Sequence, residues 1–181
     1  RESGGLIEIS NYGKFEITGP GAADWLARVM ACKVPAVGRI ALSPMLNDAS
    51  RLIGDFTMCR VAEDRFFVVG TYAAEVFYLR WFEKHLPKDG SVAIRRFGIN
   101  LVGLSVVGPN SRKVLQKLTD ADCSNEAFRF MDIREFDVNG APAIVNRLTY
   151  AGDLGYELWM EPAYQRKIYE GIKAAGAEFG I

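Results

Sequence analysis

Residues 14–20 (KFEITGP) decide the fold, because a similar stretch returns at residues 103–109 (GLSVVGP). In both stretches a run rich in apolar residues stops at a Gly-Pro pair, which is typical of a β-strand that ends in a turn. The same helical set of apolar residues follows each pair: Trp25, Leu26 and Val29 after the first, and Val114, Leu115 and Leu118 after the second. Each stretch therefore predicts a strand, a turn and an amphipathic helix.

A second pair of elements repeats in the same order. Residues 66–70 (FFVVG) precede a helical run over residues 73–85, and residues 156–160 (YELWM) precede another over residues 163–174. Pro162 suits the first turn of the later helix, where its missing amide hydrogen costs nothing. The sequence thus predicts an internal duplication of one α+β unit.

Two further strands are expected between the helices of each unit. They cover roughly residues 39–45 and 52–61 in the first unit, and residues 130–138 and 141–148 in the second. Asn139 and Gly140 separate the last pair and are a strong signal for a two-residue hairpin turn.

This pattern predicts the fold class. We expect an α+β protein made of two tandem ferredoxin-like or split β-α-β units, with helices packed on mainly antiparallel sheets. The first unit is expected over residues 1–97 and the second over residues 98–181, without a flexible linker between them.

The composition excludes several classes of protein. The chain has 181 residues, of which 49% are hydrophobic and 24% charged, so we expect a packed core rather than disorder. Lysine and arginine (22) balance aspartate and glutamate (22), which disfavours nucleic acid and anionic membrane surfaces as partners. No apolar stretch is long enough to span a membrane, and a soluble protein is expected.

Cysteine and histidine are too sparse for a metal site. Cys32, Cys59 and Cys123 show no paired spacing, and His85 is the single histidine. We therefore expect no metal ion and no disulfide frame, and a reducing compartment such as the cytoplasm. The chain opens without a methionine and closes on Phe179-Gly180-Ile181, so we treat it as a fragment.

Asp55 is the first candidate site residue, because it interrupts the apolar strand around Ile53 and Phe56. Aspartate is depleted from strands, and one between apolar neighbours is expected to lose solvent, which strengthens its field on a nearby cation. The alternative is an edge or bulge charge that faces water. The pattern alone leaves both interpretations open.

Glu157 takes a comparable place in the strand over residues 156–160. Alternation puts its side chain on the same face as Trp159, and a carboxylate there could accept two parallel hydrogen bonds from the amidine-like edge of a pterin or guanine. The alternative is a solvated strand face. Tyr150, in the glycine-containing loop just before this strand, could stack on a flat ring or only anchor the loop.

At these residues the chain resembles a known family. The resemblance rests on Ser10-Asn11-Tyr12-Gly13-Lys14 with Gly19-Pro20, on Ser43-Pro44-Met45-Leu46-Asn47 leading to Ile53-Gly54-Asp55, on Gly108-Pro109, and on residues 150–158 (YAGDLGYEL). The family is that of the folate-binding aminomethyltransferases: the glycine cleavage T protein and the C-terminal domains of dimethylglycine and sarcosine dehydrogenases. Gly54-Asp55-Phe56-Thr57 and Leu79-Arg80-Trp81 are more similar to the dehydrogenase-associated branch.

The resemblance implies the site and the reaction. Asp55 matches the catalytic carboxylate, Glu157 the glutamate that grips the amino edge of the pterin, and Tyr150 an aromatic residue of the same pocket. Met45 and Asn47 fall in the motif that leads to Asp55 and are expected to contact the folate as well. The family transfers a one-carbon unit from an amine to tetrahydrofolate and forms 5,10-methylenetetrahydrofolate.

The same resemblance implies the partners. The one-carbon donor would be an amine such as dimethylglycine, sarcosine or an aminomethyl-lipoyl protein, and the parent chain could carry an FAD domain. The location would be cytoplasmic, or the mitochondrial matrix in a eukaryote. Two alternatives remain open: demethylation of a sulfonium or methoxy donor, and a folate-binding module without enzymatic activity. Family members extend beyond both ends of this chain, so activity is expected of the parent protein rather than of the fragment.

Overall fold

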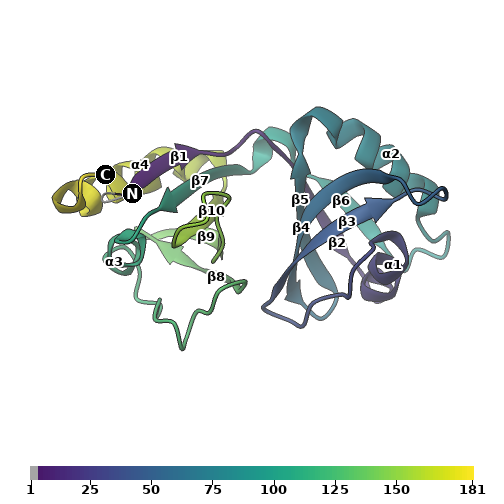
Figure 1. Cartoon of the computed structure of the whole chain (residues 1–181), viewed down its shortest axis with the longest axis horizontal. Helices are drawn as coiled ribbons and strands as arrows, with labels where there is room; N and C mark the ends of the chain where they lie inside the picture. Colours follow the sequence, from purple (N-terminus) through teal and green to yellow (C-terminus); the bar gives the residue numbers. More distant parts are fainter. Residues whose placement is uncertain (1–3) are drawn as a thin grey trace. The chain divides into compact units, whose positions relative to one another are not determined.

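The computed structural model describes residues 4–181, and packing divides them into two compact units (Figure 1). The first, which we call the N unit, comprises Asn11–Gly98. The second, the C unit, combines residues 4–10 with Ile99–Ile181. Within the described residues each unit holds one five-stranded sheet whose strand pairs are all antiparallel, which confirms the predicted α+β class.

The N unit begins with the strand and helix that the first Gly-Pro stretch predicts. Its sheet has the order β3-β4-β5-β2-β6. Its elements in chain order are β2 (Tyr12–Thr18), α1 (Ala22–Val29), β3 (Ile40–Leu46), β4 (Leu52–Ala62), β5 (Arg65–Thr71), the 3₁₀ turn η1 (Tyr72–Ala74), α2 (Glu75–His85) and β6 (Ala93–Arg96).

The C unit repeats this series, with the sheet order β1-β7-β10-β9-β8. A 3₁₀ turn, η2 (Gly98–Asn100), precedes it in the sequence. The elements of the C unit are β1 (Gly5–Glu8), β7 (Val102–Val107), α3 (Ser111–Gln116), β8 (Ile133–Val138), β9 (Ala141–Asn146), β10 (Gly155–Met160), α4 (Pro162–Gly176) and η3 (Ala177–Phe179).

The two units share one topology. A first strand, β2 or β7, lies beside the last strand of a three-stranded meander, β5 or β10, and an additional short strand flanks its other side. An internal duplication would produce this shared order, and the duplication remains our proposal.

The additional strand of the C unit comes from the other end of the chain. β1 pairs with β7, from Gly5 opposite Val107 to Glu8 opposite Leu104. The expected division into residues 1–97 and 98–181 placed this segment in the first unit. A strand of four residues is too short for its hydrophobic pattern to predict a partner strand so distant in sequence.

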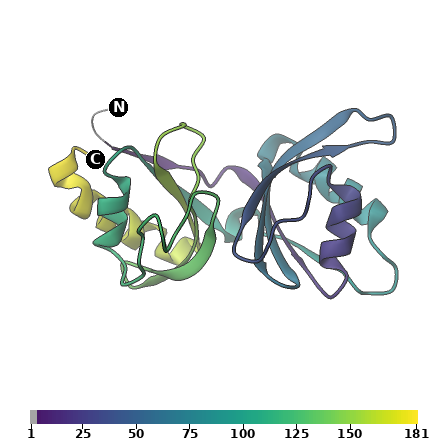
Figure 2. The ribbon, with the colours of Figure 1, turned by 60° about the horizontal axis from the view of Figure 1, so that its bottom comes forward.

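Both helices of each unit cover one face of its sheet. In the N unit the rings of Phe15 and Trp25 pack edge-on against Phe82, and the indole Nε1 of Trp25 donates to the carbonyl of His85 at 2.7 Å, which ties α1 to α2. In the C unit α3 and α4 pack together on the sheet (Figure 2). The opposite face of the C-unit sheet carries the polar side chains described next.

Candidate functional site

Glu157 stands in a polar row across the C-unit sheet. It lies on β10, opposite Asn146 of β9 and Ser105 of β7. Its neighbours Tyr156 and Leu158 belong to the core beneath α3 and α4, so the side chain of Glu157 lies on the face away from the helices. The row therefore combines a carboxylate, an amide and a hydroxyl on one face of the sheet, and the amide and the hydroxyl are buried.

The environment of Glu157 changes its acidity. Burial raises the pKa of this carboxyl from 4.5 to about 7, whereas the side chains of Asn146 and Trp159 favour the charged form and offset part of the effect. A carboxyl with this pKa exists in both protonation states near neutral pH. It can accept hydrogen bonds as a carboxylate or donate one as an acid.

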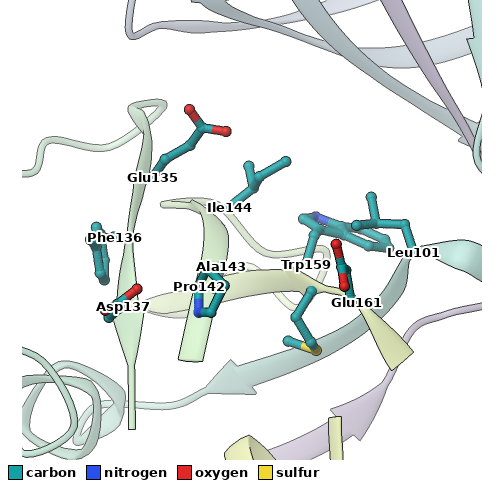
Figure 3. A pocket seen from close by; sticks show the side chains of 10 residues that line it. Leu101, Glu135, Phe136, Asp137, Pro142, Ala143, Ile144, Trp159 and Glu161 are labelled. Carbon is teal, nitrogen blue, oxygen red and sulfur yellow. The ribbon is translucent and has the colours of Figure 1, made fainter. Parts of the chain in front are cut away.

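Trp159 forms the next row of the same face. It pairs with Ile144 on one side and with Gly103 on the other. A hollow of about 370 Å³ opens beside the ring, and Figure 3 shows Leu101 and Glu161 next to Trp159, with Ile144 on the side toward Glu135. The indole is 1% exposed. Its apolar ring thus lies next to the Glu157 row on the same face of the sheet.

Asp55 lies on β4 of the N unit, opposite Pro44 of β3. β4 runs between β3 and β5, but its pairing with β5 begins only at Thr57, so Asp55 lies beyond that ladder, and its side chain is exposed. Gly54 and Phe56 face the helices, so Asp55 lies on the opposite face of this sheet. Because its side chain is exposed, the expected loss of solvent at Asp55 is wrong, and the alternative of a charge that faces water is favoured. The exposed carboxylate is accessible to a cation, and the catalytic role of Asp55 remains a prediction.

Met45 and Asn47 each have a structural role in the N unit. Met45 is fully buried in the core beneath the helices, on the face opposite Asp55. The side-chain oxygen of Asn47 accepts the backbone N–H groups of Ala49 and Arg51, both at 3.0 Å, and so closes the turn between β3 and β4. Contact of these two residues with folate remains a prediction.

Tyr150 lies in the loop between β9 and β10 and is 98% exposed. The hydroxyl of Thr149 donates to the carbonyl of Asp153 at 2.9 Å and holds the two ends of this loop together. Tyr150 and Glu157 belong to the C unit, whereas Asp55, Met45 and Asn47 belong to the N unit.

Asn146 and Ser105 are not among the site residues that the sequence predicted. Both are buried polar residues in otherwise apolar strands, the same signal that singled out Asp55 and Glu157. Their importance emerges only from the register, which places both beside Glu157.

Two further properties bear on the chemistry of the described residues. Within residues 4–181, no three side chains of His, Cys, Asp or Glu lie close enough together to hold a metal ion. In the same part of the chain, no helix combines the length and apolar character needed to cross a membrane.

The fold and the site define an α+β protein whose C-unit sheet presents a carboxylate of raised pKa on the face that its helices leave uncovered. A family model described as GCVT N-terminal domain matches residues 1–181. The chain therefore belongs to this family, which confirms the resemblance found in the sequence.

Individual relatives agree with this assignment. Dimethylglycine dehydrogenase, mitochondrial, from Mus musculus is 34% identical over 98% of this chain. Sarcosine oxidase subunit alpha from Corynebacterium sp. (strain P-1) is 32% identical over 100% of it. The chain covers 20% and 19% of these two relatives, about a fifth of their length.

A solved structure supports the fold. The glycine cleavage system aminomethyltransferase T from Bartonella henselae superposes with a TM-score of 0.81 at 23% identity. The superposition covers 96% of this chain and 46% of that protein. The two proteins thus share a fold.

Proposed function

We propose that this chain forms the folate-binding part of an enzyme that transfers a one-carbon unit from an amine to tetrahydrofolate. One observation carries the proposal: Glu157, in a chain of this family, holds a carboxyl of raised pKa beside Asn146 and Ser105 on the sheet face away from the helices. The relatives named above are enzymes that act on small amines by name.

The chemistry of Glu157 suits a pterin. The amino edge of a pterin offers two parallel N–H donors, and a carboxylate accepts such a pair with both oxygens. Charged hydrogen bonds of this kind are stronger than neutral ones, so they compensate the cost of ionising a carboxyl whose pKa is about 7. Binding of the pterin is therefore expected to be coupled to loss of a proton from Glu157.

The chemistry of Asp55 suits the transfer step. When an amine donor delivers its one-carbon unit as an iminium, the carbon carries positive charge, and a nearby carboxylate stabilises it. The same carboxylate can accept the proton that a folate nitrogen loses as it attacks that carbon. Asp55 is exposed and therefore open to such a donor.

The donor class follows from the relatives. We propose a small N-methylated amine, such as dimethylglycine or sarcosine, because two relatives carry these amines in their names. The parent protein would then include an FAD domain that oxidises the amine. One relative is mitochondrial by name, so a eukaryotic parent is proposed to reside in the matrix.

Calorimetric titration with tetrahydrofolate tests the proposal. Saturable binding by the protein is expected, with at least about tenfold weaker binding by Glu157→Gln, because a charged acceptor is lost. Glu83→Gln is the control, since Glu83 is an exposed glutamate on α2 of the N unit and takes no part in the Glu157 row. Absence of saturable binding by the unmodified protein would refute the proposal.

Product analysis in the parent protein separates the reaction types. An amine donor gives 5,10-methylenetetrahydrofolate, whereas a sulfonium or methoxy donor gives 5-methyltetrahydrofolate. Asp55→Asn is expected to abolish turnover while tetrahydrofolate still binds. Unchanged turnover in Asp55→Asn would instead indicate that Asp55 is only a surface charge.

A further inference from the structure

Arg147 is a buried cation directly after Asn146, the residue that faces Glu157. Its backbone extends the β8–β9 pairing: the N–H of Arg147 donates to Asp132 O at 2.8 Å, and Met131 N–H donates to Arg147 O at 3.0 Å. Because neighbouring residues of a strand point to opposite faces, Arg147 lies on the helix-covered side, behind Asn146.

Two arginines converge on one neutral acceptor there. The guanidinium of Arg147 donates to the carbonyl of Phe128 and, through Nη2, to the side-chain oxygen of Asn125 at 2.6 Å. Arg112 of α3 donates to that same oxygen, also at 2.6 Å. Asn125 is exposed, whereas Arg147 is 9% exposed. A surface amide thus fixes a buried guanidinium.

The network continues to β10. Arg112 Nε donates to the hydroxyl of Tyr156 at 3.3 Å, and the rings of Tyr156 and Phe128 lie with their centroids 5.7 Å apart. Tyr156 directly precedes Glu157. The network therefore contacts Arg147, which follows Asn146, and Tyr156, which precedes Glu157. Both contacts lie on the helix-covered side of the sheet.

We propose that Arg147, joined to Arg112 through the side chain of Asn125, is a positioning residue for the Glu157 carboxyl. The network keeps the ends of β9 and β10 at a fixed separation, so Asn146 and Glu157 stay in register on the opposite face. In many binding sites the side chains that touch the ligand are held in place by further residues that do not touch it. The effect of this network on folate binding rests on the proposed function. Its effect on the acidity of Glu157 does not.

Two substitutions of Asn125 test the role without removing core packing, because Asn125 is exposed. Asn125→Leu removes the shared acceptor, whereas Asn125→Asp keeps it and adds a charge that both guanidinium groups favour. Carbon-13 NMR titration of Glu157 in the ligand-free protein and calorimetric titration with tetrahydrofolate are the measurements.

In Asn125→Leu the pKa of Glu157 is expected to fall from about 7 toward the ordinary glutamate range, because the loosened strands admit water. Tetrahydrofolate binding is expected to weaken about tenfold. Asn125→Asp is expected to retain the unmodified values of both quantities.

Unmodified values in a folded Asn125→Leu variant would overturn the positioning role. Equal changes in both variants would also overturn it, because Asn125→Asp preserves the acceptor. If the unmodified protein binds no tetrahydrofolate, the proposed function fails, and the NMR titration still decides the role of the network.

Discussion

A methyl group placed on Gly103 would lie 2.6 Å from the ring carbon Cζ3 of Trp159 and 2.9 Å from Ile9. Gly103 and Trp159 are cross-strand partners on β7 and β10, and the indole occupies the space that a side chain of Gly103 would take. The missing side chain of Gly103 thus creates the space that a fully buried tryptophan fills beside the Glu157 row.

Gly103→Ala is expected to destabilise the protein by about 2 kcal/mol, because the extra methyl overlaps the Trp159 ring and buried rings move only at a cost. Urea denaturation measures the change. Gly5→Ala is the matched control in the same sheet, since among residues 4–181 its added methyl meets one atom, Val107 Cγ2, at 3.2 Å. Equal stability of Gly103→Ala and the unmodified protein would show that Trp159 is free to move away.

The raised pKa of Glu157 predicts a pH-dependent free energy of unfolding. The folded-state pKa, about 7, exceeds the ordinary value of 4.5, so the folded protein holds this proton more tightly than the unfolded chain. The resulting stability is fully present below pH 4.5 and is lost as the pH rises through about 7. The full loss is on the order of 3 kcal/mol.

Chemical denaturation of the protein and of Glu157→Gln between pH 5 and about pH 8 checks this expectation. Subtracting the two curves isolates Glu157, because every other titrating group is common to both proteins. The unmodified protein should lose more stability across this range. Parallel curves would mean that Glu157 titrates in the folded state as it does in water.

The sequence was sufficient for four strands and two helices of each unit, because their signals are local, but it did not predict the short strands β1 and β6. As expected, β2 ends just before Gly19-Pro20 and β7 just before Gly108-Pro109. Asn139-Gly140 connects β8 to β9, and both residues have positive φ. Alternation likewise placed Glu157 and Trp159 on one face. Such patterns depend only on neighbouring residues.

Features that depend on distant residues were not predictable. Nothing in residues 5–8 announces their pairing with β7, and nothing at Asn125 indicates that it joins Arg112 and Arg147. The motif that contains Met45 does not indicate which face of the sheet its side chain lies on. Register and three-dimensional packing, rather than composition, decide each of these points.

Substitution of Asn47 separates a structural role from a binding role. Asn47→Ala removes the acceptor of two backbone N–H groups and is expected to cost about 1 kcal/mol of stability. Asn47→Asp retains an acceptor oxygen and should restore most of that loss. Thermal and urea denaturation give the stabilities, and tetrahydrofolate titration of both variants gives the affinity. Weaker binding by a fully stable Asn47→Asp would favour direct contact of the Asn47 amide with the ligand.

Tyr150 offers the converse test, because it is 98% exposed and can be removed without disturbing the core. Tyr150→Ala is expected to change the free energy of unfolding by less than about 0.5 kcal/mol, as exposed substitutions usually do. If the ring stacks on the pterin, the same variant should bind tetrahydrofolate with a loss of about 1 kcal/mol, and Tyr150→Phe should bind normally. Calorimetry on the two variants distinguishes the outcomes. Unchanged affinity in Tyr150→Ala would assign the residue to the loop alone and leave Glu157 as the principal pterin contact of the C unit.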